Sequence, residues 1–128
     1  MGSDQHYPEE VPKRQEDVTA FRMDAHAVTN KCFAEFVEVT SYVTSCERPL
    51  DRSEHPDMPD FFCQPGSFVF RMTPHPVRLT DPRQWWALVP GASWRHPEGP
   101  GSSLAGREDH PVVHVSYEDA LAFARWVG

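Results

Sequence analysis

The sequence predicts an α+β domain with little regular secondary structure. Two segments, residues 30–40 and the residues that follow Ser116, have the capped amphipathic pattern of helices. Two short apolar runs, at 67–70 and 112–115, have the composition of strands. With 13 prolines and 7 glycines among 128 residues, most of the chain is expected to form turns and loops.

The chain is expected to be the front part of a larger domain. Its length fits one domain at most. Four Trp and eight Phe are many for a chain so rich in loops, and long structureless loops count against a self-contained domain. We therefore expect exposed aromatic surfaces and poor stability for the isolated chain.

The first helix is predicted over residues 30–40. Thr29 can cap its amino terminus, and Val28 can pack on Phe33 as a hydrophobic staple. Spacings of three and four residues place one apolar stripe on this helix, formed by Phe33, Phe36 and Val37.

The second half of the chain contains shorter signals. Residues 67–70 and 112–115 are predicted strands, and the tryptophan pair at 85–86 is expected on a helical turn. Ser116 is the predicted cap of the second helix, and Asp119, three residues later, completes a capping box.

The remaining residues are expected to be mainly loop. Residues 1–17 are polar and read as an extended segment, whereas the alternation over 18–24 predicts a short strand with a bulge. Proline-rich composition predicts loops over 41–66, 73–84 and 91–106. In the last of these, Arg95 and Glu98 are expected to pair across a turn.

Charge and cysteine content exclude several functional classes. A net charge of −7 without a basic stripe argues against nucleic acid and anionic membranes as partners. The polar first residues are not expected to be a signal peptide, and no apolar run reaches transmembrane length. The odd set Cys32, Cys46 and Cys63 predicts reduced thiols in a cytoplasmic protein, in preference to a disulfide.

A metal site is not expected from the seven histidines. His110 and His114 are four residues apart, but a proline and valines between them predict extended chain. Along a strand that separation is about 13 Å, too far for one ion. Hydrogen bonding that supports the structure is the preferred interpretation of both side chains.

Other catalytic patterns are equally weak. A cysteine–histidine nucleophile using Cys46 or Cys63 has no local sequence support. The carboxylates of 47–60 lie in a charged loop and are expected to be solvated. The glycine-rich run at 99–103 lacks the lysine and the following helix of a phosphate-binding loop.

The motifs of the chain resemble those of a known family. The more specific ones are residues 67–70, 85–86 and 94–100, and the more general ones are residues 28–30 and 109–116. In this order they resemble the formylglycine-generating enzyme, also called sulfatase-modifying factor. The likeness covers nearly the whole chain, so residues 1–128 are expected to be the N-terminal part of a sulfatase-modifying factor enzyme domain.

The resemblance implies a C-type-lectin-like α+β fold, incomplete in these residues. It also implies an oxidoreductase that converts a sulfatase cysteine to Cα-formylglycine with molecular oxygen and copper(I), acting on an unfolded sulfatase peptide. The family's catalytic, copper-binding cysteines and its calcium sites lie beyond the motifs present here. The chain alone is therefore expected to be inactive, with no catalytic or metal-binding residue of its own.

The resemblance implies one wall of the substrate-peptide groove, formed by Ser67, Phe68 and Trp85. Hydroxyl hydrogen bonds and flat aromatic surfaces suit an extended peptide, although core packing is an equal alternative for Trp85. Two other classes stay open: a non-catalytic member that binds a ligand or protein, and a relative of iron-dependent sulfoxide synthases. The latter would need an iron site from a preceding helical domain.

Overall fold

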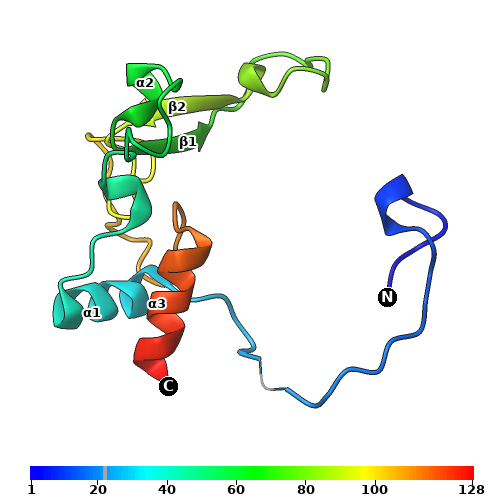
Figure 1. The fold of residues 1–128 in the computed structure, drawn as a ribbon. Helices are drawn as coiled ribbons and strands as arrows, with labels where there is room; N and C mark the ends of the chain where they lie inside the picture. Colours follow the sequence, from blue (N-terminus) through cyan, green and yellow to red (C-terminus); the bar gives the residue numbers. More distant parts are fainter. Residues whose placement is uncertain (22) are drawn as a thin grey trace.

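Two helices of 11 residues each and one β-hairpin form most of the regular structure of the described residues, and long loops connect them (Figure 1). The computed structural model describes residues 1–21 and 23–128. The α+β class is thereby confirmed. The helices and strands are α1 (Asn30–Thr40), α2 (Asp60–Cys63), β1 (Gly66–Phe70), β2 (Trp86–Pro90) and α3 (Tyr117–Val127). The 3₁₀ turns are η1 (Pro8–Glu10), η2 (Ser45–Glu47) and η3 (Pro82–Gln84).

Both predicted helices and their caps are confirmed. The Thr29 hydroxyl accepts a hydrogen bond from the Cys32 amide at the start of α1. Ser41 ends this helix in the left-handed region, with φ of 55°. At the start of α3, Ser116 and Asp119 exchange the two hydrogen bonds of a capping box.

The core lies where α1, α3 and the loop around Trp94 meet. Phe33 and Trp94 are each 1% exposed, and their rings pack edge to face with centroids 5.2 Å apart. Phe123 of α3 stacks on Phe33 at 5.8 Å and meets Phe36 edge-on at 5.7 Å. Val28 packs against this cluster from outside α1, as the staple predicts. Loop residue Trp94 is thus as central to the core as the helices.

Backbone hydrogen bonds tie the start of α1 to the segment before α3. The Asn30 amide donates to the His110 carbonyl, and the Val112 amide donates to the Val28 carbonyl, each at 2.9 Å. The strand predicted at 112–115 is wrong: an isolated bridge joins Thr29 to Pro111. His114 has φ of 58°, and this left-handed residue breaks the extended course.

Two further predictions need correction. The strand over 18–24 does not form at 18–21 or 23–24, and Arg22 lies outside the described residues. Phe21 and Met23 there are 72% and 83% exposed, so the apolar residues of the alternating pattern do not pack against a sheet. The segment 41–66, predicted as loop from its prolines, also contains the short helical elements η2 and α2. Residues 1–17 are mainly loop, as predicted, with η1 inside them.

The hairpin lies at the end of the molecule opposite α1 and α3 (Figure 1). Strands β1 and β2 are antiparallel, with Ser67 opposite Val89 and Phe70 opposite Trp86. The predicted strand at 67–70 is confirmed and begins one residue earlier. The helical turn predicted for 85–86 is wrong for its second residue, because η3 ends at Gln84 and Trp86 opens β2.

Candidate functional site

Ser67, the first predicted groove residue, is held by a histidine. Its Oγ lies 2.8 Å from Nδ1 of His114. The other ring nitrogen, Nε2, lies 2.8 Å from the Pro97 carbonyl oxygen. The partly buried imidazole therefore joins β1 to the loop that follows the core residue Trp94. The structural hydrogen bonding expected of the His114 side chain is confirmed. The His110 side chain is exposed, and the hydrogen bond at this residue is made by its backbone carbonyl, which accepts from the Asn30 amide.

The backbone around His114 is fixed as well as its ring. Its left-handed conformation turns the chain between the extended Val112 and the cap of α3. Its carbonyl accepts a hydrogen bond from the Cys46 thiol at 3.2 Å. Burial raises the pKa of that thiol, so Cys46 is a structural donor and a poor nucleophile at neutral pH.

Phe68, the second predicted groove residue, lies on the other face of the hairpin. Adjacent residues of a strand project to opposite faces, so Phe68 points away from the Ser67–His114 contact. Phe68 is 54% exposed and Trp86 is 43% exposed. These two rings, with Pro82 and Arg83, line an open hollow of about 480 Å³. Exposed aromatic rings around a hollow are typical of a binding surface.

Trp85, the third predicted groove residue, differs from its neighbour. It is partly buried at the end of η3, and its carbonyl accepts a hydrogen bond from the Arg71 amide at 2.7 Å. Trp86 lines the hollow beside Phe68, whereas Trp85 is not among its lining residues. Sequence reasoning missed Trp86 here; the signal was strand alternation, since Trp86 pairs with Phe70 on the face of Phe68. A role for Ser67, Phe68 and Trp85 in peptide binding stays a prediction.

A buried carboxylate joins η2 to α3 below the hairpin. Asp119 is fully buried and accepts hydrogen bonds from the Tyr42 hydroxyl and the Ser45 amide, each at 3.0 Å. The Ser116 amide donates a third, at 2.8 Å. Burial raises the pKa of Asp119, but these hydrogen bonds lower it by more, so the net pKa lies below its usual value. Sequence reasoning identified the cap and missed the network, because Tyr42 and Ser45 lie more than 70 residues away.

The predicted pair of Arg95 and Glu98 does not form. Arg95 lies over the Trp94 ring at 4.3 Å and reaches Glu47 at 3.7 Å. Glu98 instead pairs with Arg107, which lowers the pKa of its carboxyl. Both arginines thus bind carboxylates from outside their own turn. The Glu47 carboxylate also accepts a hydrogen bond from the Thr44 amide at 3.0 Å, so Arg95 helps to fix η2.

The described residues do not fit a copper site. Within 1–21 and 23–128, no three His, Cys, Asp or Glu side chains gather as a metal site would require. The cysteines are free and occupy three different settings: Cys32 is exposed, Cys46 bonds the His114 carbonyl, and Cys63 is buried beside the Met58 carbonyl. None of the three has a thiol partner for thiolate coordination of a metal in the described part of the chain.

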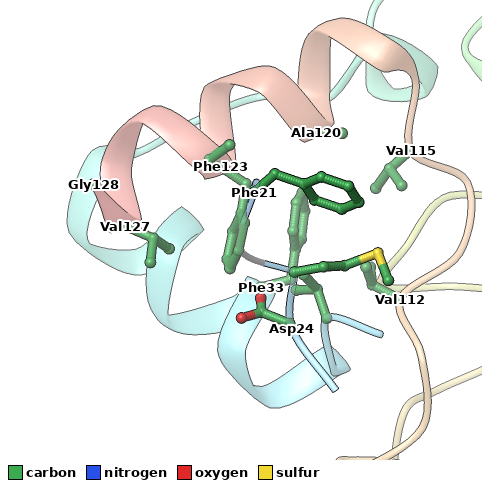
Figure 2. A pocket seen from close by; sticks show the side chains of 12 residues that line it. Phe21, Asp24, Phe33, Val112, Val115, Ala120, Phe123, Val127 and Gly128 are labelled. Carbon is green, nitrogen blue, oxygen red and sulfur yellow. The ribbon is translucent and has the colours of Figure 1, made fainter. Parts of the chain in front are cut away.

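A larger hollow, of about 960 Å³, opens beside α3 (Figure 2). Phe21, Phe33 and Phe123 point into it, and Val112 and Val115, at the right of the view, line the side next to the chain that leads into α3. Asp24 is the one ionisable side chain among the described residues that line it, and these residues therefore provide no acid–base pair. Its chemistry is that of an apolar packing surface. In the part of the chain that the structure describes, no helix combines the length and apolar character needed to cross a bilayer.

Comparison with known proteins identifies the family. The profile described as the sulfatase-modifying factor enzyme 1-like domain matches residues 1–128. The chain belongs to this family. Relatives of the chain include proteins named formylglycine-generating enzyme, as the resemblance of the motifs predicted.

Three relatives of this family show how far the likeness extends. The formylglycine-generating enzyme of Mycobacterium tuberculosis is 52% identical over 128 residues, covering all of this chain and 43% of the relative. That of Mus musculus is 40% identical over 119 residues, covering 93% and 30%. A Mus musculus protein named inactive C-alpha-formylglycine-generating enzyme 2 is 37% identical over 124 residues, covering 93% and 35%. The chain therefore spans less than half the length of these relatives.

Proposed function

We propose that this chain forms a peptide-binding part of a formylglycine-generating enzyme. In this proposal the complete protein oxidises a sulfatase cysteine to Cα-formylglycine with molecular oxygen, and its substrate is an unfolded sulfatase peptide. Family membership over the full chain supports the reaction class. The observation that carries the binding role is the exposed hollow formed by Phe68 and Trp86 on the hairpin.

The geometry of β1 suggests how a peptide would lie. Ser67 and Phe68 project to opposite faces of the strand, so a peptide that contacts both must run along its edge. In the described chain the sheet holds β1 and β2, which leaves β1 one edge without a strand partner. An extended peptide can add to such an edge through backbone hydrogen bonds while its side chains reach both faces. The proposed lectin-like fold belongs to the complete domain.

Copper(I) and calcium remain expectations for the complete protein. The cysteines and histidines described here do not form a site for copper, so the oxidising centre of the proposed enzyme would come from other parts of the protein. The role assigned to this chain is to bind and orient the peptide. A cytoplasmic location is part of the proposal, and the free thiols of Cys32, Cys46 and Cys63 support it.

The proposal is tested with the complete protein and a cysteine-containing sulfatase peptide. We expect copper(I) binding, oxygen uptake and loss of the peptide thiol as formylglycine appears by mass spectrometry. The isolated 128-residue chain should give none of these, because it has no copper site among its described residues. Peptide binding by the complete protein without oxygen uptake would contradict the enzymatic function.

A non-catalytic binding protein is the second candidate. The relatives named inactive C-alpha-formylglycine-generating enzyme 2, from Mus musculus and Bos taurus, are 37% and 34% identical to this chain. The motifs of these 128 residues are therefore compatible with that class too. Intact peptide binding with no copper affinity would favour it over the enzyme.

A further inference from the structure

The hydrogen bonds of His114 have a consequence for the hydroxyl of Ser67. The Pro97 carbonyl can only accept, so the Nε2 atom at 2.8 Å from it must carry a proton. In the neutral imidazole, Nδ1 then has a lone pair and no proton. The Ser67 hydroxyl, 2.8 Å from Nδ1, then donates its only proton to the neutral ring.

We infer that His114 is a positioning residue that makes Ser67 an obligate hydrogen-bond acceptor. This inference rests on the proposed peptide-binding function. With its proton committed to the ring, the Ser67 oxygen keeps its lone pairs for a ligand. The group that it recognises is consequently a donor, and on an extended peptide that donor is a backbone N–H. A hydroxyl that rotates freely could equally well donate its proton to a peptide carbonyl.

Other contacts hold the ring in this role. The backbone of His114 is fixed in the left-handed region at φ of 58°, and its carbonyl accepts the Cys46 thiol. The Pro97 turn is held from both sides: the Gly99 amide donates to the His96 carbonyl, and the His96 ring bonds the Ser102 carbonyl at 2.7 Å. Gly99, at φ of 110°, lies close to Val89, where a Cβ would come within 2.8 Å of that side chain. The turn that selects the tautomer is therefore packed on β2.

The tautomer is measured by long-range ¹H–¹⁵N NMR on the complete protein labelled with ¹⁵N-histidine. His114→Asn assigns the signal, since Asn tolerates the left-handed backbone. We expect Nε2–H with an unprotonated Nδ1 at His114. A ring protonated at Nδ1, whether neutral or doubly protonated, would overturn the inference, whatever the protein's activity.

The hydrogen bond to the peptide is tested by measuring the affinity of a set of sulfatase peptides. Each peptide replaces one backbone amide by an ester, which removes one N–H donor. One position is expected to lose about fivefold in affinity for the wild-type protein through Ser67. That loss should disappear in Ser67→Ala, which removes the acceptor, and shrink in His114→Asn, where the freed hydroxyl is no longer held as an acceptor. The double variant should bind no more weakly than Ser67→Ala. Ester losses that are the same in wild type and Ser67→Ala would overturn it.

These two measurements separate the inference from the function on which it rests. If the unmodified peptide does not bind the wild-type protein, the proposed function and the peptide half of the inference both fail. The NMR result still decides the polarity of Ser67 by itself.

Discussion

The α1–α3 region and the β1–β2 hairpin use aromatic side chains in opposite ways. Around α1 the rings face inward: Phe33, Phe36 and Trp94 are each no more than 2% exposed, and Phe33 contacts both of the other rings. On the hairpin, Phe68 and Trp86 are 54% and 43% exposed and line an open hollow. The first arrangement holds a structure together, and the second presents a surface.

The two regions also differ in how they are joined to the rest of the molecule. Asp119 anchors η2 to α3 through buried, charge-assisted hydrogen bonds. The hairpin is attached by the Ser67–His114–Pro97 contacts and by the close approach of Gly99 to Val89 of β2. The difference teaches that substitutions in the first region should change folding, whereas substitutions on the hairpin should change recognition.

Phe33→Ala should give the largest loss. Phe33 contacts three aromatic rings at the centre of the core, and truncation leaves a cavity among Phe36, Trp94 and Phe123. We expect the free energy of unfolding to fall by about 3–5 kcal/mol in urea denaturation of the protein. Val39→Ala on the same helix is the control: Val39 is 72% exposed, and its loss should stay within about 0.5 kcal/mol. Equal losses would contradict the assignment of the core.

Asp119→Asn should cost about 1.5–3 kcal/mol, because the amide cannot replace a carboxylate that accepts from several donors. The folded pKa of Asp119 is lowered, so its stabilisation is complete above the unfolded pKa, about 3.9 for Asp, and is lost as pH falls toward the folded pKa. Denaturation between pH 7 and pH 2 should therefore show a smaller acid loss in Asp119→Asn than in wild type. Exposed Asp109→Asn is the control and should follow wild type.

Gly66→Ala should act on the hairpin. A Cβ at Gly66 would lie 2.6 Å from the Val89 carbonyl oxygen, so the strands must shift. We expect a loss of about 1–3 kcal/mol and faster amide exchange confined to β1 and β2. Gly101→Ala is the matched control, since nothing lies within 4 Å of its added Cβ. Faster exchange spreading through α1 and α3 would show that the regions are not separable.

The parts of the fold that sequence predicts well are local. Thr29 and Ser116 cap their helices through residues only three positions away, so short patterns contain the whole interaction. The strand at 67–70 was also predictable from local sequence, because its strand-forming residues and the turn-forming residues beside them are adjacent in the chain. The family was predicted from short motifs such as residues 94–100, and the family match over the whole chain confirms it. The structure shows that Trp94 of this motif is a buried core residue.

The parts that sequence missed depend on distant partners. His114 leaves the extended conformation that its valine neighbours favour and contacts Ser67, 47 residues away. Arg95 likewise pairs with Glu47, which is distant in the sequence, and not with nearby Glu98. The choice between Trp85 and Trp86 depended on the register of β2, which is set by pairing with β1. Such choices need the tertiary arrangement.

The most direct test of the central claim compares two tryptophans with similar exposure, Trp86 at 43% on the hairpin and Trp126 at 39% beside Phe36 and Phe123. Affinity for the sulfatase peptide is measured by calorimetry on the complete protein and its variants, alongside their urea denaturation. Trp86→Ala should weaken binding about 30-fold and change the free energy of unfolding by under about 1 kcal/mol. Trp126→Ala should lower stability and leave the affinity within about twofold. Unchanged affinity in Trp86→Ala, or an equal loss in both variants, would contradict the division between a packed scaffold and a recognition hairpin.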